Sequence, residues 1–189
     1  MPYSRHPRGE GGAKDAGGNA LAADKTWSFA TSSFVAAVAF PNATAIEPGG
    51  GTLRSGTAAN LSSDDNRFYE VNSTTSGTKT SSWYGSFAAV SNGLRNLKVS
   101  YRGKNSRSCT QTVAIWRWTD STWVQLDSRS VGTTEVAISN LAPGGTLADY
   151  VSGTSGDGEV RVRARCTRSS GSSSFYASGD LMKLDFERP

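Results

Sequence analysis

The chain has 189 residues, of which 36% are hydrophobic and 19% are charged. No apolar run approaches the roughly 20 residues that a transmembrane helix needs, and Leu, Glu and Lys are too sparse for a coiled coil. The formal net charge is +4, and the basic residues are spread along the chain, whereas nucleic-acid-binding proteins concentrate them. We therefore expect no membrane span and no nucleic-acid partner, and a chain rich in β-structure.

The first part of the chain is predicted to differ from the rest. Residues 1–25 are rich in glycine and small residues and should form an extended, flexible arm. No apolar signal core follows Met1, so we expect no signal peptide in this chain. Within residues 26–48, Trp27 and Phe29 alternate as in a strand, whereas residues 34–40 fit either a short helix or a buried strand. We expect an N-terminal arm and linking segment at 1–51 and a β-sandwich module at 52–189.

Short alternating runs, separated by glycine- and serine-rich turns, fill the module. We expect nine strands, at residues 67–72, 78–90, 97–101, 110–118, 123–126, 135–139, 147–151, 159–166 and 181–186. Short strands at this spacing predict an all-β fold, namely an antiparallel β-sandwich with jelly-roll topology.

The run at 159–166 shows the clearest alternation in the chain. Because side chains alternate across a strand, Arg161, Arg163 and Arg165 should share one face. The opposite face should belong to the core and carries Val160, Val162, Ala164 and Cys166. Either the arginines pair with acidic or hydroxyl side chains on an outer sheet face, or they bind an anion or a carboxylate-bearing ligand.

Aromatic residues are the second group of candidates, for glycan binding or for a protein interface: Trp83, Tyr84, Trp116, Trp118 and Trp123. Trp116 and Trp118 are two residues apart and should face the same side of a strand. If that side is exposed, the two rings form a flat platform on which sugar rings can stack. The alternative is that these large side chains fill the core of the sandwich.

Catalytic sets are missing from the sequence. The only histidine is His6, in the predicted arm, so a Ser–His–Asp or Cys–His arrangement lacks a packed base. We therefore expect no catalytic residues, no enzymatic activity and no cofactor. Asp64 and Asp65 are weak candidates for calcium ligands, because turns of this composition are usually only solvated, and we assign no metal site.

The two cysteines, Cys109 and Cys166, each lie in a strand-like run. They are compatible with a cross-strand disulfide or with two small buried residues. If the disulfide forms, the protein works in an oxidising place.

Two stretches of the module resemble a known group of proteins. The likeness is carried by the runs at 106–112, 116–118, 123–126, 158–163 and 178–183. These resemble the non-catalytic, carbohydrate-binding-like jelly-roll modules found beside catalytic domains in bacterial extracellular hydrolases. The resemblance covers residues 52–187 and implies a β-sandwich that recognises carbohydrate.

Two functions follow as hypotheses. The first is a structural or decorating subunit of an extracellular assembly, such as the capsid or tail of a bacteriophage virion, with possible binding to surface glycans. Its N-terminal arm would contact neighbouring subunits, and the protein would be a homo-oligomer or part of a larger assembly. The alternative is a carbohydrate-binding accessory module of a secreted bacterial hydrolase. Both place the protein in a virion or outside the cell.

Overall fold

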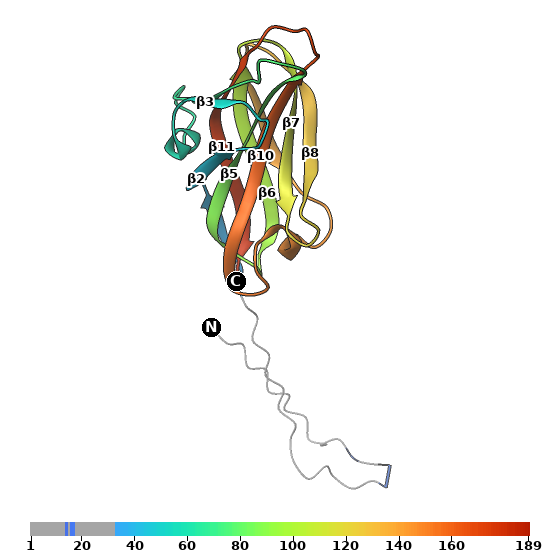
Figure 1. Cartoon of the computed structure of the whole chain (residues 1–189). Helices are drawn as coiled ribbons and strands as arrows, with labels where there is room; N and C mark the ends of the chain where they lie inside the picture. Colours follow the sequence, from blue (N-terminus) through green and yellow to red (C-terminus); the bar gives the residue numbers. More distant parts are fainter. Residues whose placement is uncertain (1–13, 15, 18–32) are drawn as a thin grey trace. The chain divides into compact units, whose positions relative to one another are not determined.

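The computed structural model describes residues 14, 16, 17 and 33–189. Residues 33–189 form one compact unit with eleven strands in two antiparallel sheets and two short 3-10 helices (Figure 1). Almost all of the predicted N-terminal arm lies outside the described residues. No helix within the described part of the chain is long and apolar enough to cross a bilayer.

The first sheet has six strands. Its order is β3-β4-β11-β6-β9, and β1 pairs with the second half of β11. The strands are β1 (Val35–Ala39), β3 (Thr52–Ser55), β4 (Tyr69–Asn72), β6 (Arg95–Asn105), β9 (Val136–Leu141) and β11 (Tyr176–Arg188). All of the pairings within this sheet are antiparallel.

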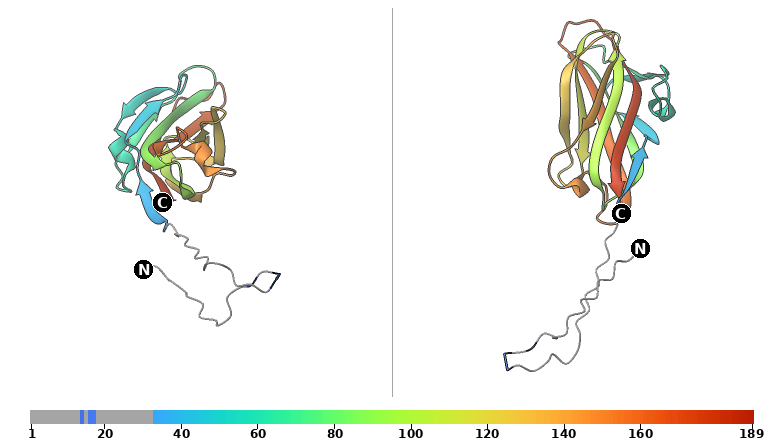
Figure 2. Two further views of the ribbon diagram at one scale, coloured as in Figure 1. Left: turned by 90° about the horizontal axis from the view of Figure 1, so that it is seen from below. Right: turned by 180° about the vertical axis from the view of Figure 1, so that it is seen from behind.

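The second sheet has five strands in the order β2-β5-β10-β7-β8. Its strands are β2 (Ala43–Ile46), β5 (Lys79–Ser91), β7 (Cys109–Arg117), β8 (Thr122–Val131) and β10 (Asp157–Arg168). The two sheets pack face to face, as the views from below and from behind show (Figure 2).

The connectivity of β4–β11 confirms the predicted jelly-roll sandwich. One sheet contains the order β4-β11-β6-β9 and the other the order β5-β10-β7-β8, so that each sheet interleaves early and late strands. This arrangement of eight strands is the double Greek key of a jelly roll. The early strands β1 and β2 lie upstream of residue 52 and add one strand to each sheet.

One predicted strand is wrong. Residues 147–151 form the 3-10 helix η2 (Leu147–Tyr150). Local hydrogen bonds satisfy this segment: the Asp149 N–H donates to the Thr146 carbonyl, and the Val151 N–H donates to the Ala148 carbonyl. The apolar residues that suggested a strand are buried in the main core, where Tyr150 and Val151 are each 1% exposed. The second short helix is η1 (Ala58–Leu61).

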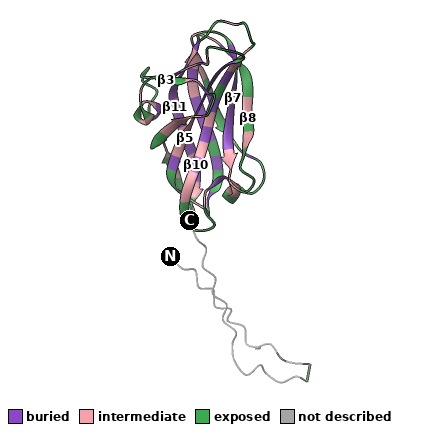
Figure 3. Ribbon diagram, in the orientation of Figure 1, coloured by how far each residue is buried: buried purple, intermediate pink, exposed green. Residues whose placement is uncertain are grey.

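The core lies between the sheets, and Figure 3 shows the buried residues along the strands of both sheets. Trp83 is at its centre and is fully buried against Tyr69, with ring centroids 4.8 Å apart. Gly179 faces this indole so closely that a Cβ there would lie 2.9 Å from it. The large side chain of Trp83 therefore fits here because residue 179 is a glycine and has no side chain.

The disulfide that the cysteine positions allow is present. Cys109 in β7 and Cys166 in β10 are bonded, with their Cα atoms 5.8 Å apart. Both are buried against Phe175 in a small apolar cluster apart from the main core. The bond joins two neighbouring strands of the five-stranded sheet and closes a long loop of the chain, which stabilises the fold mainly by restricting the unfolded state.

Candidate functional site

The five-stranded sheet carries an unusual set of side chains on the face turned away from the core. We call it the aromatic–arginine face and define it by Tyr84, Trp116, Trp118, Trp123, Arg161 and Arg163. Register brings them together, since Arg163 is opposite Tyr84 and Trp116 is opposite Trp123. The intervening residues Val160 and Val162 are fully buried, so the arginines must lie on the other side of β10. All six side chains are partly exposed.

The three tryptophan rings of this face meet edge to face. Trp116 lies between the other two tryptophans, with centroid distances of 5.1 Å to Trp123 and 6.4 Å to Trp118. Tyr84 continues the row at 5.9 Å from Trp123. The planes of Trp116 and Trp118 are 85° apart, so the flat platform expected from these two residues does not form. The rings support one another in a T-shaped arrangement, which is favourable because ring edges are positive and ring faces negative.

The arginines lie over the rings. The Arg161 guanidinium is 4.6 Å from the Trp118 centroid and 5.3 Å from that of Tyr84. The Arg163 guanidinium is 4.6 Å from the Trp123 centroid. These are cation–π distances, so each cation is attracted to a ring face as well as to its ion-pair partner.

Acidic partners balance two of the three arginines, as expected for an outer sheet face. Arg161 donates two hydrogen bonds to Glu159, at 2.9 and 3.0 Å, and Arg163 donates from Nη1 to both carboxylate oxygens of Glu47 at 3.3 Å. Arg165 is exposed, and no described residue forms an ion pair with it. Arg161 and Arg163 therefore each belong to a neutral ion pair, and of the three like charges that the sequence suggested, only that of Arg165 is left without an acidic partner among the described residues.

Titration at this face follows from the same contacts. Partial burial opposes ionisation of Glu159, but hydrogen bonds from Arg161 and Ser86 outweigh it and lower the pKa of the carboxyl. Burial lowers the pKa of Arg163, and the attraction of Glu47 counteracts this effect. The Glu159–Arg161 pair therefore stays ionised at neutral pH.

Trp83 does not belong to this face. It is fully buried and packs in the core, which removes it from the predicted glycan-binding or interface residues. The reason is strand parity: Trp83 and Tyr84 are adjacent in β5, so only one of them can face outward.

A second group of polar side chains lies on the six-stranded sheet. We call it the acidic cluster and define it by Asp64, Glu135 and Asp180, whose nearest carboxylate oxygens all lie within 4.8 Å of one another. Asp64 lies in the loop after η1, and Glu135 directly precedes β9. Asp180 is in β11 at a bulge, where the register with β6 shifts between Gly179 and Leu181.

Arg102 of β6 contacts two members of the acidic cluster. It forms ion pairs with Asp64 and, at 3.2 Å, with Glu135. Asp65, which the sequence suggested together with Asp64, is not part of the cluster, because its carboxylate accepts the Arg67 backbone N–H at 3.0 Å. One of the two weak calcium candidates is thus brought into an acidic site and the other is not.

Asp180 is the most constrained member of the cluster. It is fully buried, and its Oδ2 accepts the Asn66 backbone N–H at 3.4 Å. Its Oδ1 accepts no hydrogen bond from any residue that the structure describes. Burial, followed by a hydrogen bond shared with the Asp64 carboxyl, raises the pKa of Asp180 to about 6. Sequence reasoning missed Asp180 and Glu135, because neither the bulge nor the pairing of β6 with β9 can be recognised in a single sequence.

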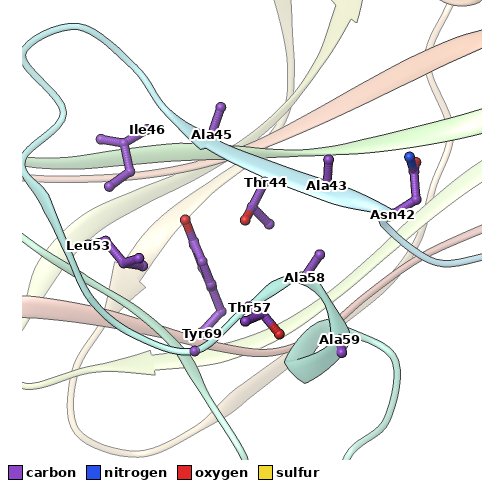
Figure 4. A pocket seen from close by; sticks show the side chains of 11 residues that line it. Asn42, Ala43, Thr44, Ala45, Ile46, Leu53, Thr57, Ala58, Ala59 and Tyr69 are labelled. Atoms are coloured by element: carbon purple, nitrogen blue, oxygen red, sulfur yellow. The ribbon is translucent and has the colours of Figure 1, made fainter.

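A separate groove lies along the outer edges of β2 and β3. It has a volume of about 680 Å³ and is lined by β2, Leu53, residues 56–59 and Tyr69, whose side chain extends toward β2 (Figure 4). Its lining contains no charged residue and none of the residues that the sequence singled out.

Comparisons with known proteins assign no family. No family model matches the chain, and no curated protein matches it. One solved structure that is similar to part of the chain is TmCBM61 in complex with β-1,4-galactotriose, with 5% identity and a TM-score of 0.43 over 77% of this chain and 87% of that chain. Another is the enzymatically active domain of tailspike protein 4 of bacteriophage CBA120, with 10% identity and a TM-score of 0.36. The match covers 79% of this chain and 19% of the tailspike chain.

Proposed function

We propose that the protein is a non-enzymatic recognition module that binds surface carbohydrate through its aromatic–arginine face. The observation that carries the proposal is the gathering of four partly exposed aromatic rings and two ion-paired arginines on one outer sheet face. Core packing explains Trp83, but it does not explain three further tryptophans on the solvent side of the sheet.

The chemistry of the face suits a polyhydroxylated ligand. Exposed parts of the indole rings offer apolar contact to the C–H groups of a sugar ring. The pairs Arg161–Glu159 and Arg163–Glu47 present donors and acceptors side by side, as the hydroxyl groups of a sugar require. Because each pair is neutral, the aromatic–arginine face carries no strong demand for a charged ligand.

The same contacts support a non-catalytic role. Glycoside hydrolysis commonly needs one carboxyl group with a raised pKa next to one that stays ionised. Glu159, at the edge of this face, has a lowered pKa, and both Glu159 and Glu47 are held by arginines. Asp180 has a raised pKa, but it is fully buried on the other sheet.

A glycan array followed by titration calorimetry tests the proposal. We expect Trp123→Ala and Trp116→Ala to lower the affinity for a glycan found on the array by at least about tenfold, as loss of a central aromatic contact does. Tyr176→Ala is the matched control, since Tyr176 is also a partly exposed aromatic residue with an arginine over its ring but lies in the other sheet. Equal binding by all four proteins would contradict the assignment of the face, and no binding to any glycan would contradict the function.

A specific observation favours a second role, in assembly. Near β1 and in β3, large apolar side chains are exposed: Val35 and Val38 by 55%, Leu53 by 53% and Phe40 by 40%. Val35, Val38 and Phe40 lie within six residues of one another, and a concentration of exposed apolar side chains is typical of protein interfaces. We propose that this surface and the N-terminal arm contact neighbouring subunits of an extracellular assembly such as a bacteriophage virion. The carbohydrate-binding accessory module of a secreted hydrolase is the alternative setting.

Light scattering after size exclusion tests this second role on the full chain. We expect an oligomer at micromolar concentration, and Val38→Asp should dissociate it because a buried unpaired charge is costly at an apolar interface. Thr133→Asp, in an exposed turn, serves as the control for the added charge. A monomer at all concentrations would contradict self-assembly.

A further inference from the structure

We propose that the acidic cluster of Asp64, Glu135 and Asp180 binds one divalent cation of the hard, oxygen-preferring class, with Ca²⁺ as the ion that fits best. This site is independent of the proposed carbohydrate-binding face, because it is built on the other sheet.

Charge is the first argument. When all three carboxyl groups are ionised, the single guanidinium of Arg102 leaves the acidic cluster with two uncompensated negative charges. Carboxylates held this close repel one another strongly where they are shielded from water. A divalent cation neutralises the remaining charge without displacing Arg102, which contacts Asp64 and Glu135 but has no ion pair with Asp180.

Asp180 supplies the second, independent argument. Buried ionisable groups are normally paired or bound to a metal, yet the Oδ1 atom of this fully buried carboxylate has no partner among the described residues. Its nearest oxygen lies within 4.8 Å of the ligand oxygens of Asp64 and Glu135. The bulge in β11 creates this placement, since a bulge re-aims the side chain of a strand residue.

Ligand chemistry favours calcium over magnesium. Mg²⁺ demands near-ideal octahedral geometry and gives up its water reluctantly, whereas Ca²⁺ accepts irregular sets of oxygen ligands at about 2.3–2.6 Å. The three carboxylate oxygens lie within 4.8 Å of one another, which is close enough for one ion to contact all three. Ca²⁺ also accepts bidentate carboxylates and water, so three side chains are sufficient to anchor it.

Binding at this point would tie together three segments that are distant in the sequence. Asp64 comes from the loop after η1, Glu135 from the start of β9 and Asp180 from β11. An ion shared by these residues stabilises the folded state, because the unfolded chain does not assemble the same ligands.

Calcium titration of the full chain, with its disulfide intact and after removal of metal by a chelator, tests the inference. We expect calorimetry with CaCl₂ to show one site per chain, and the unfolding temperature to rise with calcium concentration. MgCl₂ should bind at least about tenfold more weakly. Terbium luminescence, excited through nearby aromatic residues, gives an independent signal that calcium should compete away.

Variants identify the ligands. Asp180→Asn and Asp64→Asn should each weaken calcium binding at least about tenfold. The matched control is Asp127→Asn, which also removes a carboxylate paired with an arginine but lies in β8 on the other sheet. Should either ligand variant fail to fold, metal analysis of the wild-type protein purified without chelator and dialysed against 0.1 mM CaCl₂ still decides the question. One calcium per chain supports the site.

Three results would overturn the inference. The first is no heat and no change in unfolding temperature with calcium. The second is equal binding by wild type and a folded Asp180→Asn variant. The third is an unfolding temperature that responds to pH but not to calcium, which would assign the cluster to a proton shared between carboxyl groups.

Discussion

The aromatic–arginine face and the acidic cluster lie on different sheets and differ in charge balance. On the face, Glu159 and Glu47 neutralise two arginines, and the rings cover the cations. In the cluster, one arginine faces three carboxylates, one of them fully buried. A balanced surface with aromatic area suits a neutral ligand, whereas an unbalanced one attracts a counter-ion. The difference is the basis for proposing two separate binding sites on one sandwich.

The largest expected effect separates the tryptophan that builds the core from those proposed to contact ligand. Trp83→Ala should lower the free energy of unfolding by about 3–5 kcal/mol, because it leaves a cavity in the core. Trp123→Ala should cost less than half as much, since Trp123 is partly exposed. Urea denaturation measures both. Similar losses for the two variants would mean that the face is an extension of the core.

The next prediction concerns the ion pairs of the face. Arg163→Ala should destabilise the protein by about 1–3 kcal/mol, because it leaves Glu47, which is 20% exposed, without its cationic partner. Arg165→Ala should change stability by less than about 0.5 kcal/mol, since Arg165 is exposed and forms no ion pair with the described residues. Chemical denaturation of both variants at pH 7 checks the contrast.

Stability against pH probes the acidic cluster in metal-free protein. The pKa of Asp180 is raised to about 6 in the folded state from about 3.9 in the unfolded chain, so the folded state binds the proton more tightly. Stability should therefore fall as pH rises from about 4 to about 6 and then level off. Asp180→Asn should be more stable than wild type above pH 7, and the difference should vanish near pH 4. A difference that is independent of pH would contradict this account.

The smallest effect is expected at Asp65. Its carboxylate makes a local hydrogen bond with the Arg67 N–H and stands apart from the acidic cluster. Asp65→Asn should therefore change stability by less than about 0.5 kcal/mol and leave the response to calcium as in wild type. Thermal unfolding with and without calcium measures both. A lost calcium response would extend the cluster to Asp65.

Period-two patterns were sufficient to predict much of this molecule. Alternation located eight strands and placed Arg161 and Arg163 on one face, because side-chain direction in a strand depends only on sequence parity. Parity could not decide whether Trp83 or Tyr84 faces the core, since that choice depends on the opposing sheet. Parity also predicts that Trp116 and Trp118 lie on the same side of the strand, but it does not predict the angle between their rings.

Features that depend on pairing between distant segments could not be predicted. Glu47 is 116 positions from Arg163 in the sequence and directly follows β2, which precedes the predicted module boundary at residue 52. Asp180 is directed toward Asp64 by a bulge, and a bulge reverses the parity on which strand patterns rely. The segment at 147–151 has the composition of a strand, but its backbone hydrogen bonds are local.

Carbohydrate recognition by the aromatic–arginine face is tested most directly by following the tryptophan indole N–H signals in a two-dimensional NMR titration with an array-identified glycan. The signals of Trp116, Trp118 and Trp123 should shift with one common dissociation constant, while that of the buried Trp83 stays in place. Saturable binding that leaves all three face indoles unshifted would contradict the account.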